Sequence, residues 1–219
     1  MEDERVGQVV AEACDTLERT EIPYLLIGGL AASVHGRPRS TEDIDLLVTG
    51  ADADRALDAL AAAGFETERT NPHWIYKATR DGITADVMFK VVGDIYLDEE
   101  MLERARPVPF GSSSVQVAAP EDLIVIKALA HDEPSFRHWH DALAILATQE
   151  LDWDYLVRRA RHGAHRVLSL LVYAQSNDLI VPEAPIRELF TLIYDAGEEG
   201  ADRRRKLRPA RDVGTASGA

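Results

Sequence analysis

The sequence predicts an α/β protein of the α+β type, with a mixed-sheet unit in residues 1–118, a helical unit in residues 119–197 and a basic tail in residues 198–219. Before Pro120, short apolar runs alternate with helical stretches and glycine-containing turns, which indicates a sheet with helices. From Pro120 to about residue 196, apolar residues recur at helical spacing. The tail has few apolar residues, so we expect it to be disordered.

The elements of the first unit follow from the apolar period and from the turn residues between runs. A first helix is predicted over residues 3–19, because Val10, Cys14 and Leu17 share one face. A glycine pair, Gly28-Gly29, marks a turn from the first strand into a helix. Strands are predicted over residues 24–27, 43–48, 65–69, 73–79, 83–91 and 115–118, and further helices over residues 51–63 and 97–105. The second unit is predicted to contain helices that begin near Leu123, Ala142, Tyr155, Val167 and Ile186.

Composition and charge exclude several classes of protein. The formal charge is −14, and residues 1–202 hold 18 Lys and Arg against 37 Asp and Glu, a charge of −19, which argues against a broad nucleic-acid-binding face. No apolar stretch approaches the roughly 20 residues of a spanning helix, and the N-terminus is acidic where a signal peptide is basic, so we expect a cytoplasmic protein with no membrane partner. The single Cys14 permits neither an internal disulfide nor a thiolate metal site.

Three acidic residues interrupt apolar strands. Asp43 and Asp45 alternate with Ile44 and Leu46, so both carboxylates lie on one face of a strand, about 7 Å apart. Asp86 interrupts the run of residues 83–91 in the same way. Acids beside so much apolar sequence are costly unless they are paired or bind a cation, and oxygen ligands suit divalent cations. The alternatives are a solvated strand start for Asp43 and a water-facing edge position for Asp86.

Other side chains near these strands have structural interpretations. Lys77 and His73 lie on predicted strands beside that of Asp86, and we expect surface positions, with a role in the site as the alternative. Trp74 is expected to pack rather than to stack on a base. Asp141 is expected to be a helix cap or an ion-pair partner.

The order of strand, glycine pair, helix and paired acids resembles the nucleotidyltransferases of the DNA polymerase β superfamily. Gly28-Gly29 followed by Asp43-Ile44-Asp45 is similar to the glycine-pair and paired-acid motif of that superfamily, and Asp86 is similar to its third acid. More narrowly, residues 39–48 and the segment Pro-Glu-Asp-Leu-Ile-Val-Ile-Lys at residues 120–127 resemble a bacterial subgroup that includes toxins of abortive-infection toxin–antitoxin systems.

The resemblance implies a polymerase-β-like core and a set of site residues. Two Mg²⁺ ions about 3.5–4 Å apart would be held by the catalytic residues Asp43, Asp45 and Asp86, with Asp86 as the general base or its metal-bound equivalent. The implied nucleotide-binding residues are Gly28, Gly29, Arg39, Thr41 and Lys127. For Lys127, which lies on the apolar phase of its helix, the alternative is a stem that snorkels to solvent.

The implied reaction is Mg²⁺-dependent transfer of a nucleoside monophosphate from an NTP such as ATP to a hydroxyl acceptor, with release of pyrophosphate. The acceptor is an RNA end, a protein or a small molecule, and a toxin would have an antitoxin protein as partner. Two alternatives are a catalytically silent nucleotide- or partner-binding module with the same fold and an antibiotic-modifying enzyme. The basic tail is expected to be solvated, with RNA or partner binding as its alternative.

Overall fold

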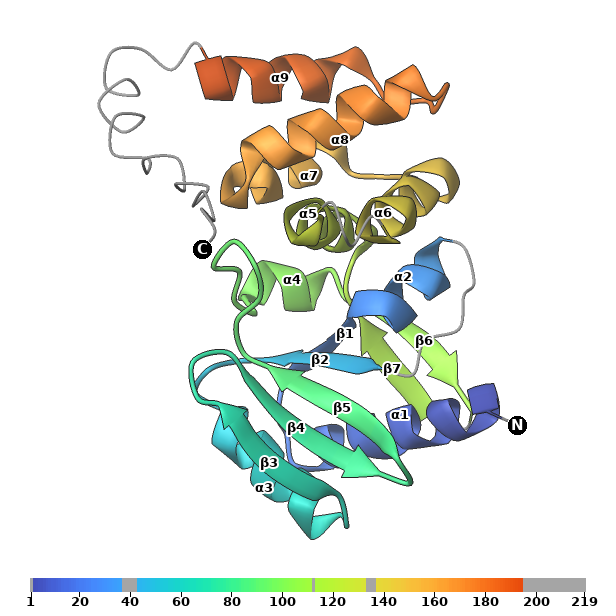
Figure 1. Cartoon of the computed structure of the whole chain (residues 1–219), viewed down its shortest axis with the longest axis vertical. Coiled ribbons are helices and arrows are strands. Elements are labelled where there is room, and N and C mark those ends of the chain that lie inside the picture. The colour runs from blue at the N-terminus through green and yellow to red at the C-terminus, as the bar shows by residue number, and fades with distance from the viewer. Residues whose placement is uncertain (1, 37–42, 112, 133–136, 195–219) are drawn as a thin grey trace, which may run out of the picture.

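The computed structural model describes residues 2–36, 43–111, 113–132 and 137–194. Within these residues, the sheet forms the lower part of the molecule in Figure 1 and a stack of helices lies above it. The predicted fold class, a mixed sheet followed by helices, is confirmed. The tail of residues 198–219 lies outside the described residues. The division of the chain into separate units at residue 118 stays a prediction.

A seven-stranded mixed sheet forms the first part of the described chain, with the order β3-β4-β5-β2-β1-β7-β6. The strands are β1 (Tyr24–Ile27), β2 (Ile44–Val48), β3 (Glu66–Asn71), β4 (Ile75–Arg80), β5 (Ile83–Met88), β6 (Arg106–Phe110) and β7 (Ser113–Val117). The pairs β2/β5 and β1/β7 are parallel, and the other neighbours are antiparallel. The paired strands β2 and β5, far apart in sequence, therefore lie at the centre of the sheet.

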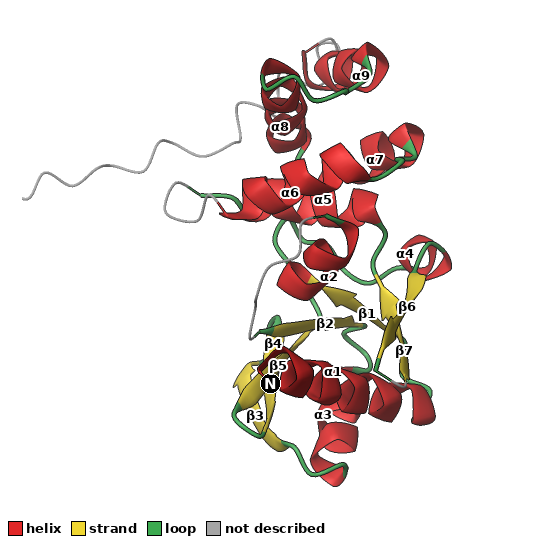
Figure 2. Cartoon of the chain, turned by 90° about the vertical axis from the view of Figure 1, so that its right-hand side faces the viewer, coloured by secondary structure: helices red, strands yellow, loops and turns green. Residues whose placement is uncertain are grey.

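The helices cover the sheet on both faces (Figures 1 and 2). They are α1 (Glu2–Arg19), α2 (Gly28–His35), α3 (Ala53–Ala62), α4 (Glu99–Glu103), α5 (Pro120–Ala130), α6 (Arg137–Thr148), α7 (Trp153–Arg159), the 3-10 helix η2 (Ala160–His162), α8 (Ala164–Ser176) and α9 (Glu183–Tyr194). Helices α1 and α3 cover one face, whereas α2 lies on the other and contacts α5 and α6. None of the described helices combines the length and hydropathy that a membrane span needs.

Strand β6 was not predicted from the sequence. Its residues Arg106–Phe110 contain Pro107 and Pro109, which cannot donate ladder hydrogen bonds and therefore weaken a strand prediction. The strand occupies the edge of the sheet and pairs only with β7 among the described strands. An edge strand needs donors on one side only, so alternate prolines are compatible with this position.

The predicted long strand of residues 83–91 is wrong in its last part. Strand β5 ends at Met88, after which the Phe89 N–H donates to the Trp74 carbonyl and the chain turns at Gly93, whose φ is +79°. An isolated bridge between Val91 and Ile95 closes this loop. The apolar run therefore continues beyond the strand because the loop packs against the helical part, where His162 Nδ1 lies 3.2 Å from the Gly93 carbonyl oxygen.

The core is continuous from the sheet into the helices. On α1, Val10, Cys14 and Leu17 are fully buried, which confirms the predicted face of this helix and the core position of the cysteine. Helix α5 is buried almost throughout, so it serves as the central helix on which α6, α7 and α8 pack. This burial accounts for the low amphipathicity of its sequence, since a helix that is covered all round has no polar stripe.

Two buried acids in the first turn of α5 fasten this helix to α7. Glu121 Oε1 accepts a hydrogen bond from the Asp152 backbone N–H. Asp122 lies 2.8 Å from Arg159 Nε and accepts a hydrogen bond from the Tyr155 hydroxyl at 2.8 Å. Removing one member of such a network leaves an uncompensated buried charge. The acids in the segment at residues 120–127 therefore hold helices together.

Candidate active site

The glycine pair forms the junction between β1 and α2, as predicted. Gly28 has a φ of +70°, and a Cβ added there would collide with the Asp45 side chain. The Gly29 backbone amide lies close enough to the Asp45 carboxylate to lower its pKa. The missing side chain of Gly28 therefore permits the close approach of Asp45 to the start of α2.

The parallel pairing of β2 with β5 brings two of the predicted acids together. Asp45 and Asp86 are direct register partners, so their side chains share one face of the sheet. Burial raises the pKa of Asp45, and the negative charge of Asp86 raises it further. Asp43 is exposed just before β2 and adds a smaller repulsion in the same direction. The concentration of negative charge favours a bound cation at this position.

Asp86 is held by a side chain from the next strand. Lys77 on β4 is its register partner, and Lys77 Nζ donates to Asp86 Oδ1 at 2.6 Å. Lys77, which remains partly exposed, therefore contacts one of the predicted site acids. In the described residues, no three His, Cys, Asp or Glu side chains are grouped closely enough to hold a metal ion. The structure thus places Asp86 beside Asp45, but the Asp86 carboxylate points toward the Lys77 ammonium.

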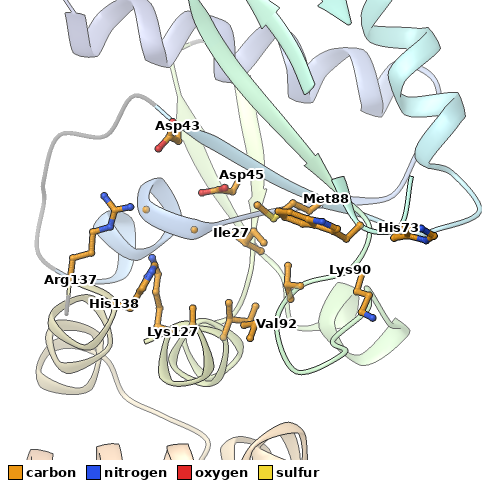
Figure 3. Close-up of a pocket in the computed structure, with 16 residues that line it drawn as sticks. Ile27, Asp43, Asp45, His73, Met88, Lys90, Val92, Lys127, Arg137 and His138 are labelled. Atoms are coloured by element: carbon orange, nitrogen blue, oxygen red, sulfur yellow. The ribbon is translucent and has the colours of Figure 1, made fainter. Parts of the chain in front are cut away.

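A cavity of about 640 Å³ lies between the sheet and the helical part. Figure 3 shows Asp43 and Asp45 on one side of this cavity, with Lys127, His138 and Arg137 projecting from the helices toward it. Its lining comprises Ile27, Gly28, Gly29, Asp43, Asp45, His73, Trp74, Met88, Lys90, Val91, Val92, Ile126, Lys127, Ala130, Arg137 and His138. The volume lies in the range of small-molecule and cofactor sites. Five predicted site residues border the cavity: Gly28, Gly29, Asp43, Asp45 and Lys127.

Lys127 is buried and paired, and it also lines the cavity. Its Nζ donates to Asp141 Oδ2 at 2.9 Å, and the two side chains are 5% and 8% exposed. The snorkelling alternative is therefore wrong, and the expected ion-pair role of Asp141 is confirmed. Lysine carries three donors, so the bond to Asp141 leaves this ammonium able to contact a ligand in the cavity. Arg39 and Thr41, the other predicted nucleotide contacts, lie outside the described residues.

Several lining residues were not predicted from the sequence. Met88 and Lys90 follow Asp86 at intervals of two, and this strand period was the signal that could have found them. Trp74 is 41% exposed and borders the cavity, so the expected packing role does not account for it. Arg137 and His138 begin α6 and border the cavity. Burial lowers the pKa of His138, and the charges of Lys127 and Arg137 lower it further, which keeps the imidazole neutral at pH 7.

Comparison with solved structures agrees with this fold. The antigenic nucleotidyltransferase-like protein of Paracoccidioides brasiliensis superposes with a TM-score of 0.52 at 14% identity, over 84% of this chain and 92% of its own. The antibiotic-resistance factor ANT(2'')-Ia superposes with a TM-score of 0.50 at 14% identity, over 81% and 94%. At such identities the likeness shows the fold alone. Curated proteins gave no significant sequence match.

Membership of a family comes from a sequence model. The model of a family described as an uncharacterised nucleotidyltransferase matches residues 5–183, most of the chain. The narrower likeness to toxins of abortive-infection systems stays a prediction. The chain therefore belongs to this nucleotidyltransferase family and is a nucleotidyltransferase enzyme.

Proposed function

We propose that this enzyme transfers a nucleoside monophosphate from an NTP to a hydroxyl acceptor, with Mg²⁺ as its cofactor. The observation that carries the proposal is the register pairing of Asp45 with Asp86 beside the glycine junction of α2. The cavity next to Asp45 is bordered on its helical side by Lys127 and Arg137. Acids on one side and cations on the other suit a triphosphate bound together with a divalent metal ion.

The donor set fits Mg²⁺. The three proposed ligands, Asp43, Asp45 and Asp86, offer carboxylate oxygens, and Mg²⁺ in phosphoryl-transfer sites is generally held by one or two carboxylates together with substrate phosphates. Asp43 and Asp45 border the cavity directly, so a nucleotide bound there would complete the coordination. When bound, Mg²⁺ supplies positive charge that offsets the charge developing on the phosphates and lowers the pKa of an attacking hydroxyl.

The residues of this chain then have distinct roles in the proposed reaction. Gly28 leaves room for the Asp45 carboxylate beside the phosphates, and Lys127 contacts phosphate oxygens from the opposite side. Asp86, on the neighbouring strand, accepts the proton of the acceptor hydroxyl once its carboxylate leaves Lys77. Arg39 and Thr41 are proposed as further triphosphate contacts on the basis of the sequence alone.

The identity of the acceptor separates the remaining alternatives. An RNA end, a protein and a small molecule all provide hydroxyl groups, and the toxin and antibiotic-modifying functions differ only in this choice. A catalytically silent module would bind nucleotide without transfer. Because the cavity has an apolar border of Trp74, Met88 and Val92 in addition to its charged side, it offers room for a flat or apolar group next to the phosphates.

The proposal is tested by incubating the purified full chain with each α-³²P-labelled NTP and Mg²⁺. Total RNA, the protein itself and an aminoglycoside panel serve in turn as acceptors. We expect labelled product with the wild type and a loss of at least about a hundredfold with Asp45→Asn, because the carboxylate nearest the glycine junction is removed. The matched control is Asp58→Asn, an exposed substitution on α3, away from the cavity.

The acceptor that becomes labelled assigns the function among the alternatives. Label on RNA or on a protein favours the toxin function, and label on an aminoglycoside favours an antibiotic-modifying enzyme. If no acceptor is labelled while NTP still binds to the wild type, the transfer proposal is wrong and the silent module takes its place.

A further inference from the structure

Lys77, Asp86 and Asp45 form a row across three neighbouring strands of the sheet. The register pairs Lys77 with Asp86 and Asp86 with Asp45, so the three side chains project from the same face of β4, β5 and β2. Lys77 Nζ lies 2.6 Å from Asp86 Oδ1, whereas the Asp45 side chain lies against Gly28 at the start of α2. The central carboxylate of the row therefore has a cation on one side and a second carboxylate on the other.

In this arrangement the Asp86 carboxylate contacts Lys77 and does not border the cavity. Asp86 is absent from the lining of the cavity, although its strand neighbours Asp45 and Met88 both belong to it. The carboxylate is directed toward Lys77. The lysine ammonium is only a hydrogen-bond donor, so it cannot itself coordinate a metal ion. The ammonium thus occupies Oδ1, one of the two carboxylate oxygens that the third acid of the site would offer to a cation.

The ion pair is of a kind that can exchange. The Lys77 side chain is 39% exposed and that of Asp86 is 19% exposed, so water reaches both groups. Ion pairs at such positions contribute little to stability, because solvent screens them and a long side chain is immobilised. A divalent cation carries twice the charge of an ammonium and, in addition, would be attracted by Asp45. A divalent cation can therefore displace the Lys77 ammonium from Asp86. Breaking this ion pair costs free energy, which lowers the affinity for the cation.

We propose that Lys77 is the resident counter-cation of Asp86 and competes with the divalent metal ion for that carboxylate. The inference rests on the proposed function in assuming that Asp45 and Asp86 share a metal ion during nucleotidyl transfer. Lys77 holds Asp86 away from the metal until Asp45 and the nucleotide phosphates have bound the ion. The lysine is thus a positioning residue that sets how tightly the protein binds a divalent cation without nucleotide.

The experiment measures Mn²⁺ binding by the full-length protein without nucleotide, from the electron paramagnetic resonance signal of the free ion. The variant Lys77→Met keeps the length of the side chain and removes its charge. We expect it to bind Mn²⁺ about tenfold more tightly than the wild type, because a unit charge next to the carboxylate is lost. Lys77→Arg, which keeps a donor and a charge, is expected to stay close to the wild type.

A matched control separates competition at Asp86 from a general change of charge. Lys90, two residues beyond Met88, borders the cavity. It forms an ion pair with Asp94, which is not one of the proposed metal ligands. Lys90→Met therefore removes the same unit charge from a lysine of the cavity lining, and we expect a change in Mn²⁺ affinity of less than about threefold. In the background of Asp86→Asn, Lys77→Met is expected to lose most of its effect, since the shared carboxylate is gone.

Two results would overturn the inference. One is equal Mn²⁺ affinity of Lys77→Met and the wild type, including no measurable binding by either protein, with circular dichroism showing that the variant is folded. The other is an equal gain from Lys77→Met with and without Asp86→Asn, which would assign the effect to charge alone. Failure of the proposed function is recognised separately, because it is judged by label transfer with Asp45→Asn and not by Mn²⁺ affinity.

Discussion

The Lys127 ammonium lies 2.9 Å from the Asp141 carboxylate, and α5 and α6 bury both side chains almost completely. A charge pair at such a position is costly to break from one side, because the remaining charge stays buried without its partner. The same lysine borders the cavity. One ion pair therefore joins the packing of the helical part to the side of the cavity that faces the acids.

The first prediction concerns the stability that depends on this pair. Asp141→Asn leaves Lys127 charged and buried, so we expect a loss of about 3 kcal/mol in the free energy of unfolding. The double variant Lys127→Met/Asp141→Leu removes both charges and is expected to lose much less than the single variants Lys127→Met and Asp141→Leu together. Urea unfolding followed by circular dichroism measures the wild type, Asp141→Asn, the two single variants of this cycle and the double variant. Additive losses would show that the two side chains are not coupled.

The double variant also isolates the role of Lys127 in nucleotide binding. Because it is expected to fold nearly as well as the wild type, a lower affinity for ATP in this background cannot be attributed to unfolding. We expect the dissociation constant for ATP with Mg²⁺ to rise about tenfold, as for the loss of one charge-assisted phosphate contact. Isothermal titration calorimetry gives this constant. An unchanged value would restrict Lys127 to packing.

Gly28 provides a prediction about the close approach of Asp45. Gly28→Ala places a methyl group against the Asp45 carboxylate at a residue whose φ is +70°. Gly82→Ala has the same backbone strain at a φ of +78°, with no atom within 4 Å of the added Cβ. We expect both variants to lose about 1 kcal/mol of stability from the left-handed backbone, and Gly28→Ala alone to lose further stability and label transfer. Equal behaviour of the two variants would contradict the importance of the Asp45 contact.

Trp74 tests whether the apolar border of the cavity takes part in ligand binding. Trp74→Ala removes a ring that is partly exposed beside Met88 and Val92, and we expect the affinity for ATP to fall about tenfold, as for the loss of one base-stacking surface. Phe190→Ala, an exposed aromatic residue on α9, serves as the control. Calorimetric titration with ATP measures both. If the two variants bind ATP alike, the nucleotide does not use Trp74.

His35 gives a prediction about acid stability. Its Nε2 lies 2.9 Å from the Ala118 carbonyl oxygen, and burial holds the pKa of this imidazole below its ordinary value. The folded state therefore binds a proton less readily than the unfolded chain, so this group contributes stability above pH 6.5, which is lost as the pH falls through the unfolded pKa toward the folded one. Urea unfolding at pH 7.5 and pH 5.5 should show a smaller acid-induced loss in His35→Gln than in the wild type. His165→Gln, on the exposed face of α8, is the control.

The elements and the acids of the candidate site were predictable because they depend on local order. The face of α1 follows from the helical period of Val10 and Leu17, and the shared face of Asp43 and Asp45 follows from the strand period of two. The glycine pair marked its junction because few other residues fit a turn of positive φ. The sequence by itself therefore determined the mixed architecture and two neighbouring carboxylates beside a tight turn.

Only the tertiary structure decided which strands are neighbours, since pairing depends on packing between segments distant in the chain. The register of β2 and β5 placed Asp86 beside Asp45, which no local pattern indicates. Packing of α6 on α5 supplied the partner of Lys127, and the edge of the sheet accommodated the prolines of β6. The period of a sequence fixes which way a side chain points along its own element, whereas the burial of apolar surface between elements selects what that side chain meets.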